Sequence, residues 1–149
     1  MKVLLEQANL NEPEVIVRGN LSSGEVKNIV GLLSGAQSSR KMFFFKDERE
    51  YLFDLKEVAY FEAVKNGAVA HIRKELYTTP ERLYELEAAL RPKGFVRISK
   101  SVIVNVECVR AVESEFSGNY ITYLTNNNDR LTISRKYIRD FKKYIMEVY

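Results

Sequence analysis

The sequence has few of the residues on which most enzymes and metal sites depend. Its 149 residues include one histidine, one cysteine and no tryptophan. A single cysteine, Cys108, excludes a disulfide framework within the chain, and with only one histidine, His71, the usual zinc ligand sets cannot be assembled. A Gly-rich phosphate loop followed by Lys is missing, and nothing singles out two of the 20 Asp and Glu as a catalytic pair. We therefore predict a protein that is not an enzyme and binds no metal or cofactor.

Long apolar stretches are missing as well. No run approaches the ~20 residues that a membrane-spanning helix needs. The N-terminal stretch MKVLLEQANL has an apolar patch that is too short for a signal peptide, and Glu6 interrupts it. The glycosylation sequon at Asn20 therefore carries no weight. We expect a cytoplasmic protein without membrane insertion.

The chain does have an ordinary globular composition, with an uneven distribution of charge. Hydrophobic residues make up 46% and charged residues 29%, which is typical of a folded domain that buries a core. Residues 91–149 hold eleven Lys and Arg against six Asp and Glu, whereas residues 1–40 hold four of each and residues 41–90 hold eight against ten. This excess of positive charge in the last third weakly favours a polyanionic partner. A solvated basic face is the alternative interpretation.

Residues 1–40 look like a separate N-terminal segment. The stretches KVLLEQ and EPEVIVRG are short, apolar or β-branched runs broken by Asn and Pro, which favours two strands. In SSGEVKNIVGLLSG, apolar residues recur at helical spacing after Ser22 or Ser23 as a cap, and Gly35 ends the helix. AQSSRK reads as a linker. We therefore predict a short ββα segment ahead of the main domain.

Residues 41–149 are predicted to be mainly β with short helices. Asn-Gly between two strand-like runs is the strongest short hairpin signal, and it places a turn at Lys65 and Asn66. Strands are expected at residues 41–46, 51–55, 57–64, 68–78, 95–98, 102–106, 108–114, 119–125 and 131–134. A helix within residues 78–92 is capped either by Thr78 with Glu81 or by Thr79 with Pro80 at the first helical position. A second helix, over residues 134–149, has one apolar face.

Three polar clusters lie at turns next to these apolar elements. They are Lys65 with Asn66, the loop that contains Arg97, Ser99, Lys100 and Ser101, and the run Ser134, Arg135 and Lys136. Their side chains suit nucleic acid, because Arg can pair with guanine, Asn with adenine, and Lys and Ser with guanine edges or phosphates. For the aromatic residues on the strands, packing in the core is the expected role.

The third cluster has an electrostatic oddity. If Ser134 caps the last helix, Arg135 and Lys136 lie in its first turn, where the helix dipole is positive. Cations are disfavoured there by roughly 0.3–1 kcal/mol each. A bound phosphate would reverse that sign, because the free N–H groups, the dipole and the cations would all face an anion. The alternative is that exposed charges at a helix end cost little and signify nothing.

Three blocks, YFEAV, FVRISKSVIVNVECVRAV and LTISRKYIRDFKKYI, together resemble the LytTR family of bacterial DNA-binding domains. The resemblance covers about residues 41–149 in the family's order. Its most distinctive part is the pattern F-x-R-x-x-[KR]-S-x-I-V-N. This chain meets the pattern with Phe95, Arg97, Lys100, Ser101, Ile103, Val104 and Asn105.

The resemblance implies small antiparallel sheets instead of a helix-turn-helix, with loops that enter successive grooves of double-stranded DNA at repeated promoter sites. It implies base contacts from Lys65 or Asn66, from Lys100 and from Arg135. Phosphate contacts by the other residues of the three clusters would set the register. The loop VKNGA is shorter than many family loops, and no role is carried over to His71. A homodimer on DNA is the expected assembly.

The resemblance also shows one departure. Many family members carry a phosphorylatable receiver domain upstream, whereas about forty residues precede the domain here. We therefore expect no phosphorelay control, and we expect residues 1–40 to pack on the domain, to drive dimerisation or to dock an unidentified signalling partner. The competing hypothesis is a protein-interaction module or anti-regulator that keeps the fold without binding DNA.

Overall fold

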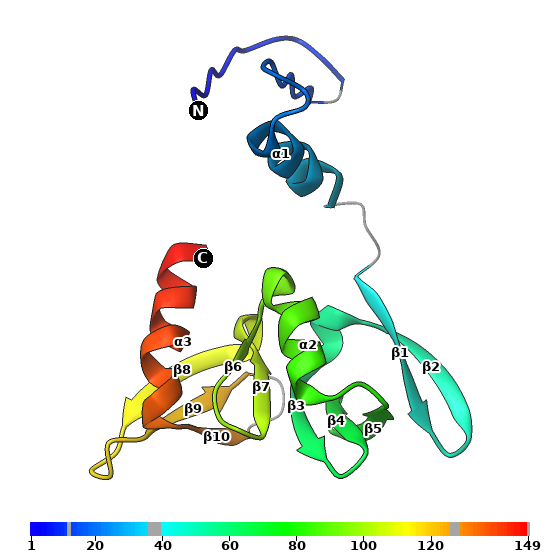
Figure 1. Cartoon of the computed structure of the whole chain (residues 1–149), viewed down its shortest axis with the longest axis vertical. Coiled ribbons are helices and arrows are strands. Elements are labelled where there is room, and N and C mark those ends of the chain that lie inside the picture. The colour runs from blue at the N-terminus through cyan, green and yellow to red at the C-terminus, as the bar shows by residue number, and fades with distance from the viewer. Residues whose placement is uncertain (12, 36–39, 126–128, 149) are drawn as a thin grey trace. The chain divides into compact units, whose positions relative to one another are not determined.

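The computed structural model describes residues 1–11, 13–35, 40–125 and 129–148, and it contains two compact units, Met1–Ser39 and Arg40–Tyr149 (Figure 1). Within the described residues, no helix combines the length and apolar character that crossing a membrane requires.

The N-terminal unit contains a helix, but the two predicted strands are wrong. Helix α1 spans Gly24–Gly35, and Ser23 is its cap, since the Ser23 hydroxyl accepts a hydrogen bond from the Val26 N–H at 3.2 Å. Residues 1–11 and 13–20 form no strand. A strand needs a neighbour to satisfy its backbone groups, and the described residues of this unit offer none. The β-branched runs are therefore left with exposed side chains.

The unit Arg40–Tyr149 is mainly β, as predicted, with two antiparallel sheets. The first has seven strands in the order β2-β1-β5-β4-β3-β7-β6 and the second has three in the order β10-β9-β8. The strands are β1 (Lys41–Lys46), β2 (Arg49–Asp54), β3 (Val58–Val64), β4 (Gly67–Ile72), β5 (Glu75–Thr79), β6 (Phe95–Arg97), β7 (Val102–Asn105), β8 (Val109–Ser114), β9 (Tyr120–Leu124) and β10 (Arg130–Ile133). The helices are α2 (Leu83–Leu90) and α3 (Arg135–Val148), with short 3-10 turns at Leu55–Glu57, Arg91–Lys93 and Val106–Cys108.

Two hairpin turns connect β3, β4 and β5, and the sequence predicts only the first of them. The turn at Lys65 and Asn66 is confirmed, because Val64 pairs with Gly67 across it. The single strand predicted over residues 68–78 is wrong: it is two strands, β4 and β5, joined by Arg73 and Lys74. Both turn residues have a positive φ, a conformation that Gly or Asn normally signals. The turn had no such signal in the sequence.

Helix α2 begins later than predicted. Its cap is Arg82, whose N–H donates to a Glu85 carboxylate oxygen at 3.1 Å, and neither Thr78 nor Thr79 caps it. Both threonines are paired with β4 in the sheet, which holds them in an extended conformation. The predicted apolar face is confirmed, because Leu83, Leu86 and Leu90 are all buried.

Alternating side chains on the central strands supply two hydrophobic cores. On β7, Ile103 packs into the core beneath α2, while Val104 packs into the core shared by the three-stranded sheet and α3. Phe61 and Tyr60 of β3 divide between the same two cores. The period of two along a strand produces this division. Strands β3, β6 and β7 therefore tie the α2 side of the unit to the α3 side.

Asn105 and Phe141 are further buried side chains of this unit. The buried Asn105 amide donates to the Val58 carbonyl oxygen at 2.9 Å, and its side-chain oxygen accepts from the Glu107 N–H at 3.1 Å. On α3, Phe141 is buried on the apolar face that the spacing predicts, and Tyr144, which the spacing did not place on that face, is buried as well. Phe141 and Tyr144 pack α3 against the second core.

Candidate nucleic-acid interface

Two backbone hydrogen bonds bring the three polar clusters together. The Ala63 N–H, near the tip of β3, donates to the Ser101 carbonyl oxygen at 2.8 Å. The Ser134 N–H, just before α3, donates to the Ile98 carbonyl oxygen at 2.9 Å. The β6–β7 loop thus lies between the β3–β4 hairpin and the start of α3, and all three lie along the lower side of the unit in Figure 1. Sequence reasoning identified the clusters but not these bonds.

The hairpin cluster presents two exposed side chains at a fixed turn. Lys65 and Asn66 are exposed, and neither side chain has a hydrogen bond or ion pair among the described residues. The Lys65 carbonyl oxygen accepts from Arg82 at 2.8 Å, which anchors the turn to the start of α2. Gly67 completes it: a Cβ at this position would lie 2.2 Å from the Thr79 carbonyl oxygen. The turn is rigid, while its two side chains remain available.

The β6–β7 loop combines an engaged arginine with a free lysine. The Arg97 guanidinium donates to the carbonyl oxygens of Ser99 and Lys100 and, at 3.0 Å, to the Glu87 carboxylate. The Ser99 hydroxyl accepts from the Ser101 N–H at 3.2 Å. The Lys100 side chain is exposed and has no partner among the described residues. Of the four predicted loop residues, Lys100 is the one whose charge is unpaired.

The β8–β9 turn holds the start of α3, a contribution that sequence reasoning missed. The Asn119 side-chain oxygen accepts from the Arg135 N–H at 3.2 Å. Ser134 occupies the cap position, since its carbonyl oxygen accepts from the N–H groups of Tyr137 and Ile138, but its hydroxyl makes no hydrogen bond with any described residue. Gly118 has a φ of +89°, and a Cβ there would lie 2.7 Å from Cδ of Arg135. The Gly-Asn pair before β9 was the available signal.

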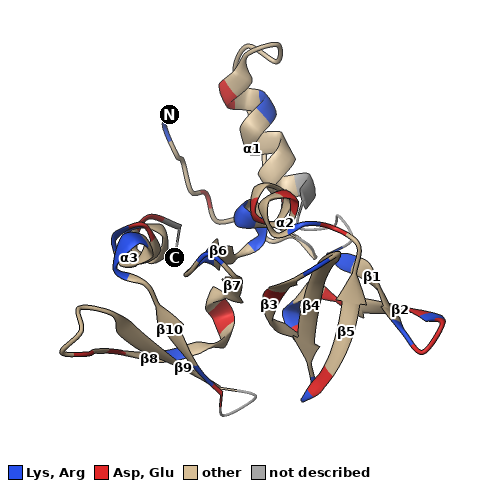
Figure 2. Ribbon diagram, turned by 60° about the horizontal axis from the view of Figure 1, so that its bottom comes forward, with Lys and Arg blue, Asp and Glu red and all other residues tan. Residues whose placement is uncertain are grey.

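The first turn of α3 is cationic, as predicted. Arg135 and Lys136 are exposed, and no acidic residue lies in this turn. Figure 2 shows Lys and Arg in blue where α3 meets β10. Neither side chain is paired among the described residues, so the unfavourable interaction with the helix dipole is not offset there. The arrangement favours an anion at this position.

Comparison with known proteins identifies the family. The model of the LytTr DNA-binding domain matches residues 48–146, about two thirds of the chain. The chain belongs to the LytTR family. All nine residues of the three clusters lie within the matched range.

Relatives of this LytTR protein include named transcriptional regulators. A Staphylococcus aureus protein named as an HTH-type transcriptional regulator is 27% identical over 140 residues, which cover 94% of each chain. The Escherichia coli transcriptional regulatory protein YpdB is 29% identical over 98 residues, which cover 66% of this chain and 40% of YpdB. The match to the first relative includes most of residues 1–40.

A solved structure shows the same fold. The LytTr DNA-binding domain of a methyl-accepting/DNA response regulator from Bacillus cereus superposes with a TM-score of 0.65 at 22% identity. The superposed region covers 71% of this chain and 96% of the Bacillus cereus domain. In the described part of this LytTR chain, strands or 3-10 turns separate the helices in sequence, in agreement with the expected absence of a helix-turn-helix.

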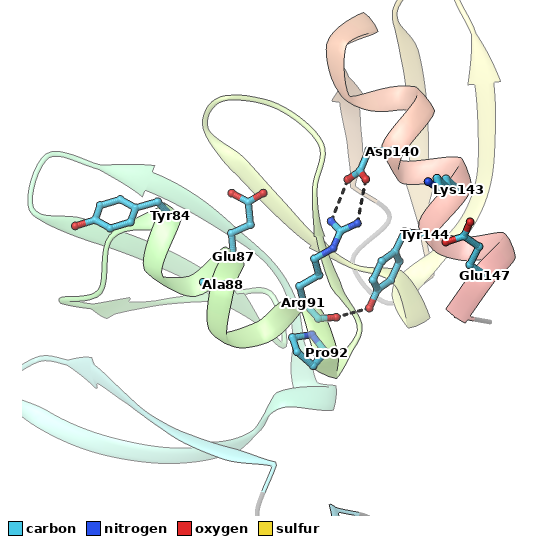
Figure 3. A pocket seen from close by; sticks show the side chains of 9 residues that line it. All are labelled: Tyr84, Glu87, Ala88, Arg91, Pro92, Asp140, Lys143, Tyr144 and Glu147. Carbon is cyan, nitrogen blue, oxygen red and sulfur yellow. Dashed lines mark hydrogen bonds and ion pairs between the residues drawn. The ribbon is translucent and has the colours of Figure 1, made fainter. Parts of the chain in front are cut away.

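A groove on the LytTR domain lies between α2 and α3 (Figure 3). Its volume is about 710 Å³, and Arg91 and Asp140 cross it as a two-pronged ion pair at 2.9 and 3.0 Å. The Tyr144 hydroxyl donates to the Arg91 carbonyl oxygen. Glu87, the partner of Arg97, also lines the groove. Glu87 therefore links the groove to the β6–β7 loop through its ion pair with Arg97.

The single histidine belongs to a cluster of side chains on the neighbouring strands β3 and β4. His71 lies 2.6 Å from the Glu62 carboxylate and stacks on Tyr60 at 3.9 Å between ring centroids. The Tyr60 hydroxyl donates to Asp129 at 3.1 Å, and burial followed by this hydrogen bond raises the pKa of Tyr60 above its usual range. The expectation that strand aromatics pack in the core is confirmed for Tyr60 and Phe61, which are buried.

Proposed function

We propose that the protein is a sequence-specific transcriptional regulator that reads repeated promoter sites through loops inserted into the grooves of double-stranded DNA. The observation that carries this proposal is the hydrogen-bonded alignment of three polar clusters on a LytTR domain. Each cluster presents an exposed cation on a fixed backbone. A rigid support for polar side chains is what base recognition requires, because hydrogen bonds to base edges are directional.

The clusters divide into base-reading and positioning groups. Lys100 and Arg135, with Lys65 or Asn66 at the hairpin, are proposed to contact bases. Both long cations suit guanine, and the amide of Asn66 suits adenine. The hydroxyl groups of Ser99, Ser101 and Ser134 and the charge of Lys136 would contact phosphates and set the register.

Residues 1–40 are proposed to pair two copies of the chain on DNA. The described part of this unit has one buried apolar side chain, Val26, whereas Leu4, Leu5, Val15 and Ile16 are exposed. Burial of such side chains in an interface is favourable. The segment has equal numbers of positive and negative residues, so charge repulsion does not prevent two copies from associating. Docking of a signalling partner is the alternative role of the same side chains.

The proposal is tested by titrating the full chain against DNA from upstream of its own gene, with scrambled DNA of equal length alongside, at two salt concentrations. Each phosphate contact contributes about −0.9 to the slope of log affinity against log salt. We expect tighter, salt-dependent binding to the upstream DNA. If neither this DNA nor any sequence selected from a random pool binds, the protein is not a DNA-binding regulator.

That negative result would favour the second candidate, a protein-interaction module that keeps the LytTR fold. The exposed apolar side chains of residues 1–40 are the specific observation in its favour. The two candidates differ in the partner on which function depends, so the same titration separates them.

A further inference from the structure

Arg97 differs from the other cations of the three clusters in having several partners. Its guanidinium makes hydrogen bonds to two carbonyl oxygens of its own loop, those of Ser99 and Lys100, and to the carboxylate of Glu87 on α2. The Arg97 side chain is 19% exposed, and that of Glu87 is 35% exposed. One side chain thus joins the end of β6, the β6–β7 loop and α2.

These bonds fix the backbone on both sides of Lys100. The Ser99 and Lys100 carbonyl oxygens belong to the peptide groups that precede and follow Lys100, so Arg97 restrains both. The Ile98 N–H donates to the Val102 carbonyl oxygen at 3.0 Å and closes the loop below them. The planar fork of Arg can hold several acceptors at once, which the single ammonium of Lys cannot do with the same geometry.

The Glu87 carboxylate also changes what Arg97 can contribute to DNA binding. An arginine already paired with a carboxylate carries little unbalanced charge toward a phosphate, and releasing it would leave Glu87 unpaired beside the polyanion. The unpaired side chain of Lys100 carries no such penalty. The two neighbouring cations therefore suit different tasks.

We propose that Arg97 is a positioning residue: with Glu87 of α2 it sets the direction in which Lys100 meets the base, and it makes no DNA contact itself. This inference rests on the proposed function. It replaces the DNA contact that the sequence predicted for Arg97, and it makes α2 part of the recognition mechanism. The α2–α3 groove, which Glu87 lines, is then connected to the DNA-reading loop.

Replacing Glu87 separates the two roles by its effect on the preference for cognate over scrambled DNA. If Arg97 contacts phosphate, Glu87→Ala frees its charge and strengthens binding to every DNA. If Arg97 positions Lys100, Glu87→Ala lowers the preference for cognate over scrambled DNA by about tenfold, as expected when a charged hydrogen bond is lost. Glu147→Ala is the matched control, because Glu147 is an exposed glutamate on α3 without an ion pair among the described residues.

Replacing Arg97 gives a second readout. Arg97→Lys keeps the charge, so a phosphate contact would survive with an unchanged salt slope and unchanged specificity. We expect instead that Arg97→Lys lowers the preference for cognate over scrambled DNA by about tenfold, while the salt slope stays the same. Lys100→Ala should lower this preference as well. Full retention of specificity in Arg97→Lys would overturn the inference.

Hydrogen exchange without DNA shows whether the loop itself has changed. In Glu87→Ala we expect faster exchange at the amides of Ser101 and Ala63, which donate to Ser99 and to the Ser101 carbonyl oxygen, with an unchanged melting temperature of the domain core. Unchanged exchange would overturn the inference even if wild-type protein reads DNA normally. If wild-type protein shows no preference for any DNA, the proposed function fails first, so the two failures are distinguishable.

Discussion

The two units of this protein differ in how far they bury their apolar residues. The unit Arg40–Tyr149 buries its large side chains in two cores, and Phe44, Phe61, Phe95 and Phe141 are almost entirely inaccessible. In the N-terminal unit, Leu5 is 95% exposed and Val26 is the one apolar side chain in the described residues that is buried. The difference indicates that the unit Arg40–Tyr149 is stable through its own packing. The described residues of the N-terminal unit leave an apolar surface exposed.

Matched valines test this comparison with the largest expected effect. Val104 is fully buried in the second core, whereas Val3 is exposed. Val104→Ala should lower the free energy of unfolding by about 2–3 kcal/mol, since the lost methyl groups leave a cavity, and DNA binding should weaken as the fold is lost. Val3→Ala should change it by less than about 0.5 kcal/mol. Denaturant unfolding measures both, and equal effects would show that the two environments do not differ.

Matched arginines locate DNA recognition. Arg135→Ala should cost roughly 1–3 kcal/mol of binding free energy for the cognate DNA and relax the preference at one base position. Arg18→Ala, in the N-terminal unit, should leave that preference intact. Fluorescence anisotropy with cognate DNA and single-base variants measures both proteins. An equal loss by Arg135→Ala on cognate and scrambled DNA would exclude base reading by this residue.

Matched leucines test what the exposed apolar surface does. Leu4→Ser combined with Leu5→Ser should weaken self-association by about tenfold or more, because burial of a leucine contributes about 1.5–3 kcal/mol. Leu52→Ser, at an exposed position on β2, should leave self-association unchanged. Analytical ultracentrifugation over a range of concentrations gives the dissociation constants. A monomeric wild-type chain would assign this surface to a different partner.

Matched glycines give the smallest expected effect. Gly118→Ala places a methyl group in a positive-φ turn against the Arg135 side chain, and about 1 kcal/mol of stability should be lost together with part of the cognate affinity. Gly31→Ala lies within α1 with no atom near its added Cβ, so it should be neutral or slightly stabilising. Thermal melts of both variants, followed by DNA titration, check this pair. Unchanged affinity in Gly118→Ala would exclude a role for the β8–β9 turn in holding Arg135.

Local signals in the sequence were sufficient for much of the domain. Asn66 and Gly67 marked the hairpin, Leu83, Leu86 and Leu90 marked the face of α2, and the run before α3 marked its cationic start. Each of these depends on residues within one turn or one strand. They were therefore visible without knowledge of the fold.

The errors arose where tertiary contacts decided the outcome. Arg73 and Lys74 adopt positive φ without a glycine, because β4 and β5 pair on either side of them. Thr79 pairs in the sheet and does not cap α2. The N-terminal runs have strand-like composition but no neighbouring strand among the described residues. Sequence alone also could not reveal that Glu87 holds Arg97, since ten residues and a turn separate them.

The most direct test of the account is to map the bound DNA on the protein by NMR. Amide shifts of the full chain are followed as the tightest-binding DNA is added, with scrambled DNA as the control. We predict specific changes in all three clusters, at Lys65 and Asn66, at Ser99 to Ser101, and at Ser134 to Lys136, with none on β2. Changes confined to one cluster, or centred on the α2–α3 groove, would contradict recognition by three aligned clusters.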